Sequence, residues 1–268
     1  MTIRNLFSYL KRIYILDHKQ TKEIIVELNI LRLLKALYVY IRILSVSSKK
    51  LSQNLTKEQR KIGGKGSINK YFDLKLWIFR NMLRALRLDL DRLEKITIID
   101  LGSGLCFFSI IAEHYGHEVW NIDLPEDSDS KYYGDIYSTV PKILNRKKVF
   151  HNITPEKPLP KCIEELIVKS EREILIVGYM ICFNNHKTKN LWGKKEWEKF
   201  INNLNEIKND TSIYLQFNAE ENGEFFSEQV KSIFIKNHFI QIGENCQSKK
   251  GIKLRDKQII INSKEIVR

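Results

Sequence analysis

The sequence contains few cysteines, and the four that are present are scattered. Cys106, Cys162, Cys182 and Cys246 form no C-x-x-C pair, and the histidines are not clustered. Structural zinc sites need closely spaced Cys and His ligands, so the sequence predicts no metal centre. Isolated cysteines favour reduced thiols, and we therefore expect a cytoplasmic protein.

Long uncharged stretches are also missing from the N-terminal region. Uncharged runs there, such as residues 36–41, are far shorter than the roughly 20 apolar residues that a membrane span requires. The first residues lack the apolar core and small-residue cleavage site of a secretory signal. We therefore expect neither a spanning helix nor a leader peptide.

Acidic residues are scarce in the first quarter of the chain. Residues 1–70 hold 15 Lys/Arg and 4 Asp/Glu, whereas residues 71–268 hold 30 and 28, so almost all of the net charge of +13 lies near the N-terminus. Residues 22–44 show helical periodicity, with an apolar stripe (Ile30, Leu34, Leu37, Ile41 and Leu44) and a basic stripe (Arg32, Lys35 and Arg42). Such a helix packs on its own domain or a second subunit, or lies on an anionic membrane. A nucleic acid partner is disfavoured, because no basic and aromatic platform recurs in the rest of the chain.

Two segments suggest a domain boundary before residue 63. Residues 45–59 are polar and predict a linker, and the glycine-rich segment 63–66 predicts a loop or hinge before a helix at 71–92. We expect a basic helical extension over residues 1–62 and a main domain over residues 63–268.

Glycine is uncommon, with 12 residues in 268, yet two flank one serine in Gly102-Ser103-Gly104. An apolar run over residues 96–99 ends at Asp100 before this turn, and a predicted helix over 105–115 follows it. A second apolar strand over 118–122 then leads to Asp123. A strand, a glycine turn, a helix, a second strand and an acidic residue follow each other in this order in nucleotide-binding units. The carboxylate at the end of the second strand can accept both hydroxyls of a ribose.

A third glycine is absent from this turn, and Phe107 stands where a dinucleotide fingerprint requires it. The segments IIDLGSG and NIDLP together resemble the first two motifs of class I S-adenosylmethionine-dependent methyltransferases. The resemblance implies S-adenosylmethionine as the cofactor. It implies a cofactor site made of Asp100, Gly102, Ser103, Gly104, Asp123, Leu124 and Asn152.

The remaining pattern predicts a Rossmann-like, doubly wound sheet of seven strands. Further strands are expected at 148–152, 173–183, 211–217, 238–242 and 258–262, with helices within 134–144 and at 164–171, 192–208 and 224–237. No helix is predicted between the last two strands, so we expect an antiparallel C-terminal strand. Class I methyltransferases end in such a hairpin. The segments HNITPEKPLP, CFNNH, LWGKKEW and YLQFN also resemble a poorly characterised bacterial subgroup of that family, and the resemblance covers residues 71–265.

Candidate acceptor residues follow the fourth strand. His186 is the best candidate for a base, with Asn184, Asn185 and Trp192 as substrate residues, although each of these can equally be a surface or core residue. Phe183-Asn184-Asn185-His186 lacks the prolines found after this strand in amino methyltransferases of nucleobases and protein glutamine. Cys106 is expected to be a packing residue, since no cationic partner is evident.

These patterns predict methyl transfer to an oxygen of a small molecule or saccharide. Two alternatives remain open. One is a non-catalytic methyltransferase-like scaffold that uses its basic helix to contact a protein or membrane. The other is a nicotinamide-dependent oxidoreductase, which Phe107 and the expected terminal hairpin disfavour.

Overall fold

Parallel strands form the centre of the molecule, because their residues are apolar on both faces. The computed structural model describes residues 29–56, 74–124, 136–181, 192–208, 211–217, 228–242 and 257–261. Five strands lie in the order β3-β2-β1-β4-β5, and β7 and β6 extend the sheet beyond β5. The strand bounds are β1 Thr97–Leu101, β2 Glu118–Asp123, β3 Lys148–Phe150, β4 Ile174–Ile181, β5 Ser212–Phe217, β6 Phe239–Ile242 and β7 Lys257–Ile261.

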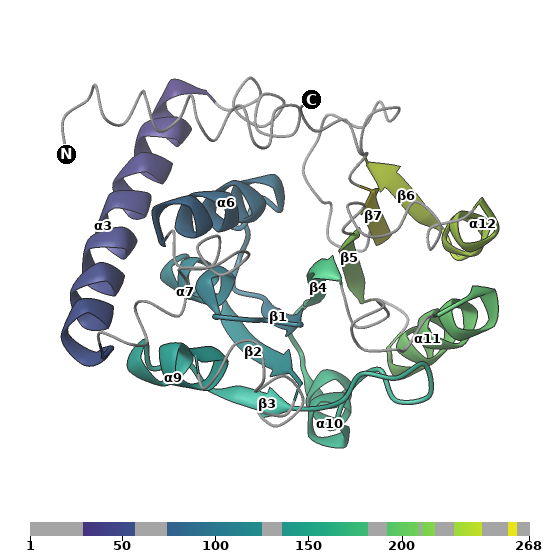
Figure 1. Ribbon diagram of the computed structural model, residues 1–268. Coiled ribbons are helices and arrows are strands. Elements are labelled where there is room, and N and C mark those ends of the chain that lie inside the picture. The colour runs from purple at the N-terminus through teal and green to yellow at the C-terminus, as the bar shows by residue number, and fades with distance from the viewer. Residues whose placement is uncertain are drawn as a thin grey trace, which may run out of the picture.

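Helices cover both faces of this sheet (Figure 1). One layer contains α6 (Leu74–Arg87), α7 (Phe107–His114) and α9 (Ile136–Ile143), with α3 (Ile30–Asn54) lying outside them. The opposite layer contains α10 (Lys161–Lys169), α11 (Lys194–Ile207) and α12 (Glu228–Lys236). The protein is thus an α/β protein with a parallel sheet, consistent with a Rossmann-like fold.

Every strand pairing among the described residues is parallel, which corrects the prediction of an antiparallel C-terminal strand. β7 pairs in parallel with both β5 and β6. The prediction was wrong because it assumed that only a helical connection can join two adjacent parallel strands. A crossover of about a dozen residues is enough, and residues 243–256 provide that length between the end of β6 and the start of β7.

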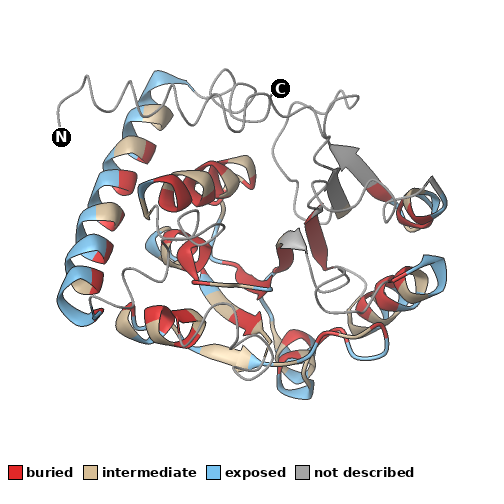
Figure 2. Cartoon of the chain, viewed as in Figure 1, coloured by how far each residue is buried: buried red, intermediate tan, exposed pale blue. Residues whose placement is uncertain are grey.

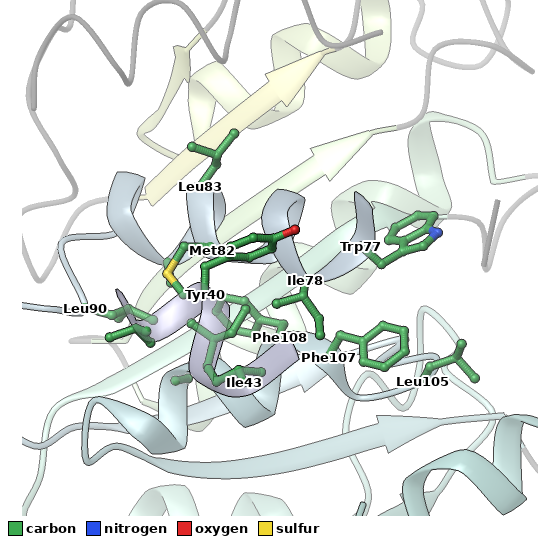
Figure 3. Close-up of a cluster of buried hydrophobic side chains, with 14 of the residues drawn as sticks. Tyr40, Ile43, Trp77, Ile78, Met82, Leu83, Leu90, Leu105, Phe107 and Phe108 are labelled. Carbon is green, nitrogen blue, oxygen red and sulfur yellow. The ribbon is translucent and has the colours of Figure 1, made fainter. Parts of the chain in front are cut away.

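The N-terminal helix belongs to the core of the described structure. Tyr40 and Ile43 of α3 pack with Ile78 and Met82 of α6, next to Phe108 of α7 (Figure 3). Tyr40 also makes an edge-to-face contact with Phe79, at 5.8 Å between ring centroids. Close packing of this kind shows that α3 covers the α6–α7 layer. The predicted boundary between residues 62 and 63 lies outside the described residues.

The expected linker at residues 45–59 is wrong over its first two thirds, since α3 continues to Asn54. Ser47, Leu51 and Leu55 extend the buried stripe of α3 at intervals of four residues. Most other polar residues of this segment form its exposed side, so composition alone suggested a loop. At the other end, the Asn29 side chain caps the helix by accepting the N–H of Arg32 at 2.8 Å.

Arg32 also departs from its predicted position on the basic stripe. Its guanidinium binds Asp91 through two hydrogen bonds of 2.6 and 2.7 Å and donates to Asp89 at 2.6 Å. It further donates to the carbonyl oxygen of Leu86 at 2.9 Å. Arg32 therefore ties α3 to the turn that follows α6.

Among the described residues, none of the helices combines the length and the apolar character needed to cross a membrane.

Candidate functional site

The glycine turn lies at the carboxyl end of β1, beside the end of β2. Gly102 and Gly104 have φ values of +68° and +54°, a region that only glycine adopts readily. The N–H groups of Gly102 and Ser103 both donate to the carbonyl oxygen of Ile122, at 2.8 and 3.1 Å. The turn is thereby fixed to β2, one residue before Asp123.

Space is left in front of Gly102. A Cβ placed on this residue would meet no atom of the described residues within 4 Å, and Gly102 itself is exposed. Gly104 is more enclosed, because the ring of Tyr137 on α9 would lie 3.6 Å from its Cβ. The turn therefore presents an open backbone surface on one side and an aromatic wall on the other.

Asp123 is held at the mouth of the site by two contacts. Its Oδ1 accepts the N–H of Leu124 at 2.9 Å, and its Oδ2 accepts Lys148 Nζ at 2.6 Å. Lys148 is only 4 % exposed and also donates to the carbonyl oxygen of Tyr137 at 2.9 Å. Each carboxylate oxygen retains a further lone pair, so the oriented carboxylate can still accept two hydroxyl groups.

Asp100 lies beneath the turn and is 2 % exposed. The pKa of Asp100 is raised to about 8, chiefly by burial and also by the charge of Asp123, although the charges of Arg84 and Lys148 lower it in part. Asp100 is therefore mostly protonated at pH 7. A buried acid with this pKa can donate a hydrogen bond when neutral, and it ionises readily when a cation comes near.

Tyr179 and Arg84 lie on the same face of the sheet as Asp100. The Arg84 guanidinium lies 4.4 Å from the centre of the Tyr179 ring, which also packs on Phe108 and Tyr214. The Tyr179 hydroxyl is buried and has no hydrogen-bond partner among the described residues. Burial raises the pKa of Tyr179, and Asp100 raises it further. This buried, unsatisfied hydroxyl near Asp100 is a polar group available to a ligand.

Cys106 follows the turn and adopts a left-handed conformation, with φ of 60°, before α7 begins. Its side chain is fully buried, and burial raises the pKa of its thiol to about 12. The thiol therefore stays protonated at neutral pH, in keeping with a packing role. Phe107, in the place of the third fingerprint glycine, is buried among the α6 and α7 side chains.

Six of the predicted cofactor residues come together at the carboxyl edge of β1 and β2: Asp100, Gly102, Ser103, Gly104, Asp123 and Leu124. Asn152 is exposed just beyond the end of the neighbouring strand β3, two residues after Phe150, which pairs with Asp123. His151 next to it is bound through its ring to the carbonyl oxygen of Lys157 at 2.8 Å.

Of the predicted acceptor residues, the structure describes only Trp192. Trp192 is 2 % exposed and packs on Trp197 and Phe200, at 4.9 and 5.2 Å between ring centroids. Trp192 is thus a core residue rather than a wall of an acceptor site, because its ring completes the aromatic cluster beneath α11. Asn184, Asn185 and His186 lie outside the described residues, as does the segment 63–66.

Sequence reasoning missed Lys148 and Arg84. Lys148 pairs in register with Asn121, two residues before Asp123, so a lysine at the start of a strand was the available signal. That signal was hidden by the abundance of lysine throughout the chain. The sequence offered no signal for Arg84, since only the packing of α6 places this residue near Asp100.

A depression of about 570 Å³ lies at the opposite edge of the sheet. It is lined by α10, by the amino ends of β1 and β2 and by the turn before β4, and its residues include Thr97, Glu118 and Arg172. The pair Glu118–Arg172 is exposed on both sides. In open α/β sheets ligands bind beyond the carboxyl ends of the strands, so we place the functional site at the glycine turn.

Among the described residues, no group of three His, Cys, Asp or Glu side chains is arranged to hold a metal ion. The site consists of the glycine turn fixed to β2, the oriented carboxylate of Asp123 and the buried Asp100 with its raised pKa. No protein-family model matches the chain, and no curated protein matches its sequence.

Proposed function

We propose that the protein is an S-adenosylmethionine-dependent methyltransferase. The observation that carries the proposal is the placement of the glycine turn and Asp123 side by side at the carboxyl edge of two adjacent parallel strands. Asp123 is oriented by Leu124 and Lys148 so that it can accept the two hydroxyls of a ribose. The open space at Gly102 would receive the body of the cofactor.

The turn favours a cofactor without a pyrophosphate. A phosphate is usually held by free N–H groups at such a turn. Here the N–H groups of Gly102 and Ser103 are already bound to the carbonyl oxygen of Ile122. Phe107 fills the position where close approach of a helix to a pyrophosphate needs glycine. Both features disfavour a nicotinamide dinucleotide.

Asp100 suits a cofactor that carries positive charge. When bound, S-adenosylmethionine would supply a methyl group on a cationic sulfur, already activated for transfer. A nearby cation would favour ionised Asp100, so the buried acid would release its proton on binding. The chain's own role would be to orient the two reactants and exclude water.

We further propose an oxygen of a small molecule or saccharide as the methyl acceptor. The segment after β4 lacks the proline pair that amino methyltransferases of nucleobases and protein glutamine carry there. Asn184, Asn185 and His186 of this segment would contact the acceptor, with His186 as its base.

The proposal is tested by calorimetric titration with S-adenosylhomocysteine and, separately, with NAD. We expect micromolar binding of the first ligand only. Asp123→Asn, which keeps an acceptor for the Leu124 N–H, is expected to weaken binding at least tenfold. Glu118→Gln, at the other end of the same strand, is the matched control and should bind like the wild type.

Removing the charge of Asp123 leaves Lys148 buried without its counter-ion, so stability must be followed by thermal melting. The double variant Asp123→Asn/Lys148→Met removes that cation as well and is expected to be folded but weak in binding. Wild-type affinity in a folded Asp123 variant, or binding of NAD alone, would overturn the proposal.

A further inference from the structure

The outer face of α3 carries large apolar side chains that nothing in the described structure covers. Figure 2 shows that the side of α3 turned away from α6 is exposed along its length. Five apolar residues in its first half are 50–76 % exposed: Ile30, Leu31, Leu34, Tyr38 and Ile41. Leu31, Leu34, Tyr38 and Ile41 are three or four positions apart, so they form one continuous stripe. At 1.5 Å per residue, the stripe from Ile30 to Ile41 is about 17 Å long.

This stripe is a concentrated feature. In the described part of the chain, the other large apolar residues with high exposure outside α3 are Phe150, Val168 and Ile235, which lie on three separate elements. Single exposed apolar residues of that kind are normal on protein surfaces. A contiguous stripe usually marks an interaction site.

The charge beside the stripe has only one sign. α3 contains five Lys and Arg residues and no Asp or Glu over its 25 residues. Arg32 turns inward to Asp89 and Asp91, but Lys35, Arg42 and Lys49 are exposed. On a helix these three positions follow each other along one line, next to the apolar stripe. The surface therefore combines apolar contact with positive charge.

We propose that the outer face of α3 docks the protein on a bilayer surface that contains anionic lipid. The apolar stripe enters the boundary between head groups and acyl chains, while Lys35, Arg42 and Lys49 contact the anionic head groups. The inner face of α3 stays packed on α6, so docking requires no rearrangement of the core.

A second copy of the chain is a poorer occupant for this face. Pairing two such helices would bring the cationic lines of both copies together, and α3 offers no acid to compensate them. An anionic bilayer instead gains from every one of these charges, because each Lys or Arg near its surface strengthens the attraction. Charge complementarity therefore selects the lipid surface.

The test is co-sedimentation of the full chain with vesicles. Vesicles of phosphatidylcholine alone are compared with vesicles containing 30 % phosphatidylglycerol, at low and at physiological salt. We expect binding to the anionic vesicles only, and weaker binding as the salt concentration rises. Leu31→Gln/Leu34→Gln/Ile41→Gln and, separately, Lys35→Gln/Arg42→Gln/Lys49→Gln should each lower the partition coefficient at least tenfold.

Val168→Gln/Ile235→Gln is the matched control, because these residues are 65 % and 55 % exposed on α10 and α12. This variant should bind vesicles like the wild type. The proposal is overturned if the wild type ignores anionic vesicles, or if both α3 variants bind as the wild type does. A dimer in light scattering that the apolar α3 variant dissociates would also overturn it and assign the face to a second copy.

Discussion

Replacing Asp100 with Asn is expected to stabilise the protein at neutral and alkaline pH. Asp100 is buried beneath the glycine turn, and its pKa in the folded chain is about 8 against an ordinary value of 3.8. The cost arises because the ionised carboxylate loses its hydration on burial, and Arg84 and Lys148 compensate only part of that loss. Asn has nearly the same shape and carries no charge to bury.

The sign and size follow from proton linkage. Between pH 3.8 and 8 the folded chain keeps a proton on Asp100 that the unfolded chain has released, so the free energy of unfolding falls as the pH rises. This loss of unfolding free energy is absent below pH 3.8, the pKa of Asp100 in the unfolded chain, and it is complete above pH 8. At pH 7 it amounts to about 4 kcal/mol, a large share of the 5–15 kcal/mol typical of a folded protein.

Urea denaturation of both proteins from pH 5 to pH 8.5 measures this effect. The difference in unfolding free energy between Asp100→Asn and the wild type should grow with pH and level off above pH 8. Titrating groups far from Asp100 contribute equally to both proteins and cancel in the difference. A difference that stays constant across this range would refute the reasoning, because Asp100 would then not titrate within it.

Three further predictions concern proton release and stability. Calorimetric titration with S-adenosylmethionine at pH 7, in buffers of different ionisation enthalpy, should show release of nearly one proton for the wild type and none for Asp100→Asn. In urea denaturation, Arg32→Ala should lower the unfolding free energy by about 3 kcal/mol, since it leaves the carboxylates of Asp89 and Asp91 without Arg32. Arg42 is exposed, so Arg42→Ala should change the unfolding free energy by less than about 0.5 kcal/mol. Equal losses in the two variants would contradict the assigned ion-pair network. Burial lowers the pKa of His117, whose Nδ1 accepts the Ile96 N–H, so the contribution of this residue to stability should fall as the pH drops below about 6.5. The difference in unfolding free energy between the wild type and His117→Gln should therefore shrink over that range. An identical pH slope in both proteins would refute this role.

The sequence contained enough information for the local parts of the site. Gly102, Gly104 and Asp123 were placed correctly because a strand, a turn and a second strand are specified by neighbouring residues. The same holds for β3 to β7, whose bounds differ from the predicted ones by at most a few residues. The direction of β7 was missed, because the path between strands depends on packing and not on local pattern.

Features that depend on distant parts of the chain could not be predicted in this way. Ser47 and Leu51 looked like linker residues, but the packing of α3 on the rest of the core buries both. Arg32 shared a pattern with Lys35 and Arg42, and only the turn after α6 drew it inward. Trp192 was expected at an acceptor site, but the aromatic residues of α11 take it into the core.

The two hydrogen bonds to the carbonyl oxygen of Ile122 hold the glycine turn and the end of β2 together, so that they move as one unit. A force applied at Asp123 is transmitted to Gly102 and Ser103 through two bonds rather than along the intervening α7. The amide hydrogens of these two residues should accordingly exchange slowly with solvent, although they belong to a turn. The nuclear magnetic resonance signals of these two amides would change when the end of β2 moves. They are therefore suitable probes for ligand binding at the site.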